Sequence, residues 1–142
     1  MILDISRTWQ KDRYSCGSRS LFCIAKYFEV VNSWWEVKTL TKELVVDITK
    51  GINGNEMKGL IHTVGLKYKT IKNVTLRKIK NSIEWEIPII CTVDDESHWL
   101  VIKGIDEEYV YINDPALITP QVYYKDLFFE TLDAEEAYSI SY

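Results

Sequence analysis

The sequence predicts an α+β fold in which helices of the N-terminal half pack on an antiparallel sheet formed by the C-terminal half. Apolar residues recur with helical spacing as far as Ile83, and short apolar runs of strand type begin at Ile87. The 142 residues contain no internal repeat and no linker rich in proline and glycine. We therefore expect a single domain over residues 1–142.

Four helices are expected in the first half. The first has its first turn at or just after Cys16 and runs to Phe28, because the apolar residues between them share one helical face. The next three cover residues 34–45, 55–64 and 75–83, each with apolar residues on one side. These helices would supply one layer of the fold.

The second half has the character of strands. Apolar runs predict strands at residues 87–93, 98–105 and 109–114. An amphipathic piece follows near residues 124–129, and a last strand is expected at residues 137–142. Because helices come first and strands later, the sheet should be antiparallel with helices packed against it.

Charge and hydropathy exclude several classes of partner. The net charge of −4 and the isoelectric point near 5.2 argue against nucleic acid or an anionic membrane as the main partner. No apolar run approaches the roughly 18–20 residues that a membrane span requires, so no membrane insertion is expected. The N-terminus does not resemble a secretory signal, which favours a cytoplasmic protein. A basic stretch at residues 67–80 contains no acid and is either a solvated face or a docking surface for an acidic partner.

The cysteines predict free thiols and no metal site. Cys16, Cys23 and Cys91 have no paired spacing, and with only His62 and His98 beside them they form no zinc pattern. Neither a metal nor another cofactor is therefore expected. An odd, sparse cysteine count without a signal peptide is typical of a reducing compartment.

Cys16 is the candidate nucleophile, since a cysteine with a histidine far along the sequence is a candidate catalytic pair. At the N-terminus of a helix, the backbone amides and the helix dipole favour the reactive thiolate. Gly17 leaves room beside the thiol for a substrate backbone and is a candidate substrate-binding residue. The alternative is that Cys16 is a small buried apolar residue, as Cys23 and Cys91 are expected to be.

His98 and Asp114 are the candidate base and its orienting acid. A plain hairpin around residues 106–108 would place them directly opposite each other on one face of the sheet, with Cβ atoms about 4.5–5.5 Å apart. That arrangement would fix the tautomer of a catalytic imidazole. A register slip of one residue would send the two side chains to opposite faces, and a surface His–Asp pair without a catalytic role is the alternative.

Two further residues complete the candidate site. Gln10 lies six residues before Cys16, near enough to fold back beside the thiol and donate its amide to an oxyanion. Taken alone, a glutamine in a polar N-terminal segment is usually a surface residue. Trp99 adjoins His98 and is a candidate substrate-binding residue.

Three runs of sequence resemble a known family: Gln10-Lys-Asp-Arg-Tyr-Ser-Cys16-Gly17, His98-Trp-Leu-Val-Ile-Lys-Gly104 and Asn113-Asp114-Pro115. Together they resemble the bacteriocin leader-processing, or double-glycine, cysteine peptidases of the papain-like superfamily. The similarity covers nearly the whole chain, because residues 54–66 and the Ile87-Pro88-Ile89-Ile90 strand also match in the family's order. The resemblance implies a papain-like fold. It also implies that Cys16 is the nucleophile, His98 the base, Asp114 the orienter and Gln10 the oxyanion-hole residue.

The sequence departs from the family pattern at three positions. Ser15 stands where the family often has an acid, Ser18 where it often has proline, and Glu29 where a glycine is frequent. These changes touch packing and substrate choice rather than the four chemical positions. Many members are N-terminal domains of peptide exporters, and nothing resembling a transporter follows Tyr142. The chain is accordingly expected to be a free-standing relative or an excised domain.

The predicted function is that of a cysteine peptidase that cleaves a peptide bond, in a leader peptide after small residues, through a thioester acyl-enzyme. The expected partner is a peptide or protein substrate, with an exporter or an inhibitor or immunity protein as further candidates. Three alternatives stay open. The same triad could transfer the acyl group to an amine, the chain could be a toxin neutralised by a partner protein, or it could bind peptides without cutting them.

Overall fold

The computed structural model describes residues 1–93, 98–116 and 120–142. The helices are α1 (Cys16–Tyr27), α2 (Trp34–Leu44), the short 3-10 helix η1 (Ile48–Lys50), α3 (Gly54–Thr63), α4 (Leu76–Glu84) and α5 (Lys125–Thr131). The strands are β1 (Lys67–Thr70), β2 (Ile89–Val93), β3 (His98–Ile105), β4 (Tyr109–Asn113), β5 (Val122–Tyr124) and β6 (Leu132–Ser141).

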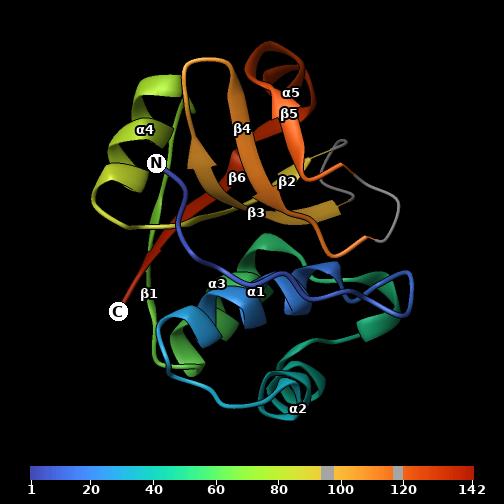
Figure 1. The fold of residues 1–142 in the computed structure, drawn as a ribbon. Coiled ribbons are helices and arrows are strands. Elements are labelled where there is room, and N and C mark those ends of the chain that lie inside the picture. The colour runs from blue at the N-terminus through green and yellow to red at the C-terminus, as the bar shows by residue number, and fades with distance from the viewer. Residues whose placement is uncertain (94–97, 117–119) are drawn as a thin grey trace.

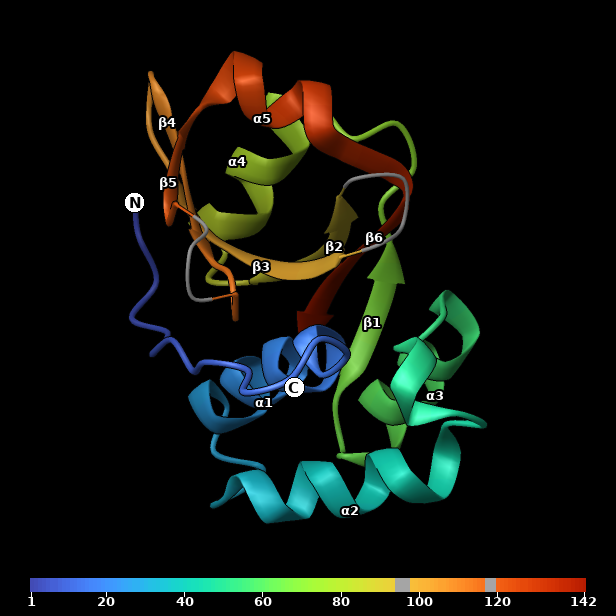
Figure 2. The same cartoon turned by 90° about the vertical axis from the view of Figure 1, so that its right-hand side faces the viewer.

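The six strands form one antiparallel sheet in the order β1-β6-β2-β3-β4-β5. Figure 1 shows α1, α2 and α3 below the sheet. The turned view of Figure 2 places α4 and α5 on the other side of β3. The predicted α+β class, with N-terminal helices packed on an antiparallel sheet, is confirmed.

Local signals fix the start and the end of α3. The side chain of Asn53 accepts a hydrogen bond from the Glu56 amide (2.8 Å), and the Glu56 carboxylate accepts one from the Asn53 amide (3.0 Å). This capping box satisfies amides that would otherwise lack partners at the helix start. Gly65 follows the helix with a φ of 96°, a left-handed conformation that favours glycine. The buried side chains of α3 then face the core.

The sequence predicts the four N-terminal helices to within two residues at each end, and it predicts β3 to the residue. It does not predict β1 and β5, and it makes β6 too short. Both missed strands are the outermost strands of the sheet. An edge strand such as Lys67–Thr70 is largely exposed, so it lacks the apolar alternation that identifies a strand.

The predicted register of the hairpin is wrong, because His98 and Asp114 are not directly opposite each other. Near the turn, Gly104 pairs with Tyr111, whereas beyond it Ile102 pairs with Ile112. Lys103 is therefore an extra residue on β3, a β-bulge.

The bulge changes which residues share a face. The pairing beside the turn, continued without a bulge, would set Asp114 opposite Val101 and send His98 to the other face. The bulge shifts the pairing by one residue, so Asp114, just past the end of β4, comes level with Leu100. His98 lies two positions further along β3 on the same face. The pair thus meets diagonally rather than directly across the sheet.

The N-terminal segment lies along β3 at the bulge. The Leu3 amide donates to the Lys103 carbonyl (2.7 Å), and Ile2 forms an antiparallel bridge with Gly104. A Cβ atom at Gly104 would lie 2.9 Å from both the Ile2 Cα atom and the Met1 carbonyl oxygen. The glycine is needed here because two backbones approach too closely for a side chain.

The basic stretch of residues 67–80 forms β1, α4 and the turn between them, and most of its cationic side chains are exposed. In the parts of the chain that the structure describes, every helix is too short or too polar to cross a membrane.

Candidate active site

The loop before α1 sets the position of Cys16. The carboxylate of Asp12 accepts hydrogen bonds from the amides of Tyr14 (2.9 Å) and Ser15 (2.7 Å), which holds the turn that leads into the helix. Helix α1 then begins at Cys16, as predicted. The first amides of a helix have no partner within it, so the thiol lies at the positive end of the helix dipole.

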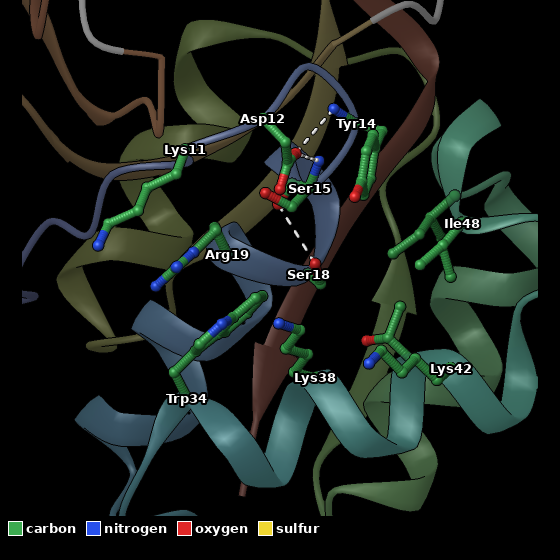
Figure 3. A pocket seen from close by; sticks show the side chains of 12 residues that line it. Lys11, Asp12, Tyr14, Ser15, Ser18, Arg19, Trp34, Lys38, Lys42 and Ile48 are labelled. Carbon is green, nitrogen blue, oxygen red and sulfur yellow. Dashed lines mark hydrogen bonds between the residues drawn. The ribbon is translucent and has the colours of Figure 1, made fainter.

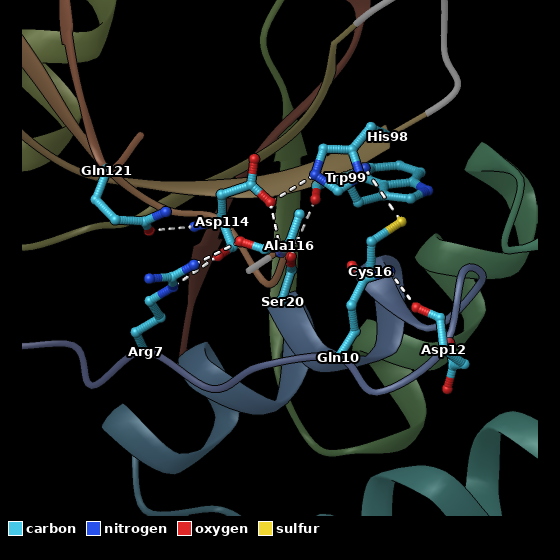
Figure 4. A network of polar contacts seen from close by, with 10 residues as sticks. All are labelled: Arg7, Gln10, Asp12, Cys16, Ser20, His98, Trp99, Asp114, Ala116 and Gln121. Atoms are coloured by element: carbon cyan, nitrogen blue, oxygen red, sulfur yellow. Dashed lines mark hydrogen bonds and ion pairs between the residues drawn. The ribbon is translucent and has the colours of Figure 1, made fainter. Parts of the chain in front are cut away.

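Cys16 is enclosed between the start of α1 and the start of β3. Only 6% of the residue is exposed, and the backbone amide of Trp99 donates to its sulfur at 3.5 Å. The sulfur also lies close enough to His98 to raise the pKa of its imidazole. Figure 4 shows the thiol directed toward His98 and Trp99. The sulfur therefore faces the imidazole, as a cysteine–histidine pair requires.

His98 and Asp114 form a short hydrogen bond. The His98 Nε2 atom lies 2.5 Å from the Asp114 Oδ1 atom (Figure 4). The same carboxylate oxygen accepts a hydrogen bond from the Ala116 amide (2.9 Å). Asp114 is fully buried, whereas 20% of the His98 side chain is exposed. Since Nε2 is directed at the acid, the other ring nitrogen is left for the sulfur of Cys16.

These neighbours shift the charge state of His98. Burial by itself lowers the pKa of the imidazole, because it disfavours the charged form. Hydrogen bonds and charges from Asp114 and Cys16 act in the other direction and raise the pKa to about 10. An imidazolium beside a sulfur is the environment that activates cysteine nucleophiles.

Gln10 lies in the segment before α1. Its backbone amide donates to the Pro115 carbonyl (2.9 Å), which joins this segment to the chain just after Asp114. Its side-chain nitrogen donates to the Asp12 carbonyl (2.7 Å), and its side-chain oxygen is buried without a hydrogen-bond partner among the described residues. The amide is thus held in the loop that carries Cys16.

Gly17 and Trp99 pack in the core rather than along an open groove. A Cβ atom at Gly17 would lie 3.0 Å from the Trp99 ring, so the missing side chain makes room for the indole. Trp99 is 2% exposed, and its indole nitrogen donates to the Ile52 carbonyl (2.8 Å). A substrate finds almost no indole surface here. Gly17 was expected to leave room for a substrate beside the thiol. Its missing side chain instead leaves room for the Trp99 indole.

Two residues that the sequence did not single out hold Asp114 in place. Arg7 donates from Nε to the Asp114 carbonyl (2.8 Å) and from Nη2 to the Ala116 carbonyl (2.5 Å). The side-chain oxygen of Gln121 accepts from the Asp114 amide (2.8 Å). An isolated arginine or glutamine gives no sequence signal, because such contacts depend on the folded chain.

Within the described residues, no group of three or more histidine, cysteine or acidic side chains could hold a metal ion. All three cysteines are buried, and none of them is in a disulfide. The reactive groups gathered at the start of α1 are therefore a thiol, an imidazole, a carboxylate and a carboxamide.

A cysteine at the start of a helix, facing a histidine strand of an antiparallel sheet, defines a papain-like cysteine peptidase. Residues 4–131 match the model of the Peptidase C39 family, and the chain belongs to that family. It is a cysteine peptidase, and the resemblance to the double-glycine peptidases is confirmed. No curated protein sequence matches the chain.

Solved structures share the fold at low sequence identity. A double-glycine motif protease from an AMS/PCAT transporter, solved with the leader peptide, has a TM-score of 0.78 at 20% identity, over 99% of this chain and 94% of that one. The peptidase domain of Streptococcus ComA, a bi-functional ABC transporter of a quorum-sensing pathway, has a TM-score of 0.69 at 16% identity, over 94% of each chain. A C39-like peptidase from Bacillus anthracis has a TM-score of 0.72 at 14% identity, over 99% of this chain and 97% of that one.

Proposed function

We propose that the chain cleaves a leader peptide after small residues, with Cys16 as nucleophile, His98 as base, Asp114 as its orienter and Gln10 as an oxyanion donor. The observation that supports the proposal is the hydrogen bond between Asp114 and His98, together with the Cys16 sulfur that faces His98 from the start of α1 (Figure 4). This arrangement supports the proposed roles, because a catalytic histidine needs a nucleophile on one side and an orienting acid on the other.

In the first half of the reaction, the Cys16 sulfur attacks the carbonyl carbon of the scissile peptide bond. His98 holds the thiol proton and passes it to the leaving amine, so the C–N bond breaks and a thioester remains. In the second half, His98 takes a proton from water, and the resulting hydroxide attacks the thioester. The peptide acid leaves, and the thiol recovers its proton.

Gln10 and the helix start would hold the negative oxygen of both intermediates. Of the two hydrogens on the side-chain nitrogen of Gln10, the Asp12 carbonyl takes one, and the other is left for the oxyanion. The Cys16 amide, at the N-terminus of α1, is the second donor. Asp114 keeps the imidazole oriented with Nε2 toward itself.

The enclosure of the sulfur supports small residues beside the scissile bond, since a bulky side chain would clash with the walls around a cysteine that is 6% exposed. Two of the similar structures come from transporters, and one holds a leader peptide. On that ground we propose a leader peptide as substrate and an exporter as partner. An inhibitor or immunity protein stays a prediction. The cysteines are thiols rather than disulfides, which supports action in a reducing compartment.

The test compares Cys16→Ala with Cys23→Ala on synthetic peptides that each contain one Gly-Gly step. Cys16→Ala should abolish cleavage and keep the melting temperature, whereas Cys23→Ala should keep cleavage. Iodoacetamide should label Cys16 faster than Cys23, whose pKa is raised by burial. Cleavage by Cys16→Ala would contradict the proposal. Peptide binding by the native chain without cleavage would favour a binding module instead.

A further inference from the structure

A cavity of about 300 Å³ lies beside the candidate active site, between the start of α1, helix α2 and the loop before Cys16 (Figure 3). We call it the Arg19 pocket. The residues that matter for its chemistry are Lys11, Ser15, Arg19, Trp34, Lys38 and Lys42. It is a separate site, because Cys16, His98 and Asp114 do not line it.

Arg19 is held in this pocket without a hydrogen-bond acceptor for its Nε atom. The guanidinium carbon lies 3.8 Å from the centre of the Trp34 ring, so the cation stacks on the indole. The Nε atom is buried and has no hydrogen-bond partner among the described residues. Burial lowers the pKa of Arg19. A buried donor on a cation is costly unless an acceptor satisfies it.

Ser15 supplies a second unsatisfied group to the same cavity. The residue is 6% exposed, and its hydroxyl oxygen is buried without a hydrogen-bond partner among the described residues. The neighbouring Ser18 hydroxyl donates to the Ser15 carbonyl (3.2 Å) rather than to the Ser15 hydroxyl. Two buried polar groups on one helix, four positions apart, thus line one cavity.

The charge of the lining selects an anion. Lys11, Lys38 and Lys42 add three ammonium groups to the guanidinium, and Asp12 is the acid among the lining residues. One oxygen of Asp12 already accepts two backbone amides. Cations therefore outnumber acids, and a ligand that brings a carboxylate would pair with the guanidinium and accept from the Ser15 hydroxyl.

The position of the pocket indicates where the carboxylate comes from. Ser15 directly precedes Cys16. Arg19 follows Cys16 by three residues, so on α1 it lies about 60° short of one full turn from the nucleophile. An extended peptide advances ~3.3 Å per residue. With its scissile bond at Cys16, a side chain a few residues away along the peptide could therefore reach the Arg19 pocket. Trp34 and Ile48 add apolar walls that fit the methylene groups of aspartate or glutamate.

We propose that the Arg19 pocket binds the carboxylate of an acidic side chain in the peptide substrate, close in sequence to the cleaved bond. The inference rests on the proposed peptidase function and adds a substrate preference to it. Arg19 pairs with the carboxylate, Ser15 donates its hydroxyl, and the surrounding lysines supply positive potential.

The first measurement is a cleavage profile on a library of peptides that contain Asp, Glu, Asn or Gln at each position near one Gly-Gly step. The native chain should cleave peptides with an acid at one position at least about tenfold faster than their amide counterparts, as expected for a charge-assisted hydrogen bond. Arg19→Met should remove this preference, and Lys80→Met, at an exposed position of α4, should retain it. If Arg19→Met does not fold, Lys38→Glu on α2 should remove it instead.

An outcome without acidic preference, or a preference that survives Arg19→Met, would overturn the proposal.

A second measurement does not depend on cleavage and follows the side-chain Nε–H signal of Arg19 by NMR. N-acetylglutamate methylamide should shift that signal, and N-acetylglutamine methylamide should not. If the native chain cleaves no peptide, the proposed function fails. A shift would then still support a carboxylate site, and its absence would end the proposal. Tighter binding of inorganic phosphate than of the glutamate compound would assign the pocket to a free anion and also overturn it.

Discussion

At the scale of single residues, the neighbours of a side chain decide what it can do. From the sequence, Cys16 could be placed at a helix start and His98 and Asp114 on one hairpin, because both follow from local patterns, but the predicted register was wrong. The structure brings these three together. The contacts of Arg7 and the packing of the Trp99 ring against Gly17 could not be predicted, since both depend on residues far away along the chain.

The raised pKa of His98 predicts how stability depends on pH. The folded pKa is about 10, against an ordinary value of 6.5, so protonation of His98 stabilises the folded state. This contribution is fully present below about pH 6.5 and is lost as the pH rises toward about 10. The difference in unfolding free energy between the native chain and His98→Gln should therefore shrink over that range.

Urea unfolding at several pH values measures this difference. His62→Gln, at an exposed position of α3, is the control for removal of a histidine. A gap between the native chain and His98→Gln that stays constant from about pH 6.5 to about 10 would contradict the assigned charge state.

At the scale of elements, the β-bulge at Lys103 is the feature that the sequence does not show. The alternation of apolar residues predicts the strands themselves, but a bulge leaves no separate mark in that alternation. The N-terminal segment contacts the bulge, because the Leu3 amide donates to the Lys103 carbonyl, and local patterning in the hairpin does not show this contact. Register could not be derived from the hairpin alone for this reason.

Gly104→Ala tests the close approach of this segment to β3. The new Cβ atom would lie 2.9 Å from backbone atoms of Met1 and Ile2, so the segment must move. We expect a loss of about 1–3 kcal/mol in unfolding free energy, measured with urea. Gly59→Ala in α3 is the matched control, because its Cβ atom would meet nothing within 4 Å, and it should stabilise by ~0.5–1 kcal/mol. Equal effects of the two substitutions would rule out the crowding.

At the scale of the whole molecule, the first ten residues join the helical layer to the sheet. They contact β3 near its bulge, pass Asn113, whose side-chain amide donates to the Ile5 carbonyl (2.7 Å), and reach the chain after Asp114. Arg7 lies at the centre of this path and bonds to the Asp114 and Ala116 carbonyls. The segment therefore links the position of the acid to that of the nucleophile.

Arg7→Met should loosen the Asp114 segment without touching a substrate. We expect kcat to fall by about tenfold to a hundredfold with little change in KM, as small misplacements of catalytic groups do. Arg13→Met, an exposed position in the same N-terminal stretch, should leave both constants unchanged. Steady-state kinetics on a cleaved peptide decide the matter, and a rise in KM alone would assign Arg7 to substrate binding.

The bulge also limits how a gene for this hairpin can change in length. His98 and Asp114 are sixteen positions apart, and they share a face only because Lys103 has no counterpart on β4. A codon gained or lost at the turn tip, near Glu107, leaves the paired strands in step. A codon gained or lost between the tip and either catalytic position reverses the face of one of them. Such an insertion or deletion keeps the site only if a second one restores the single extra residue on β3, so the two mutations must be inherited together.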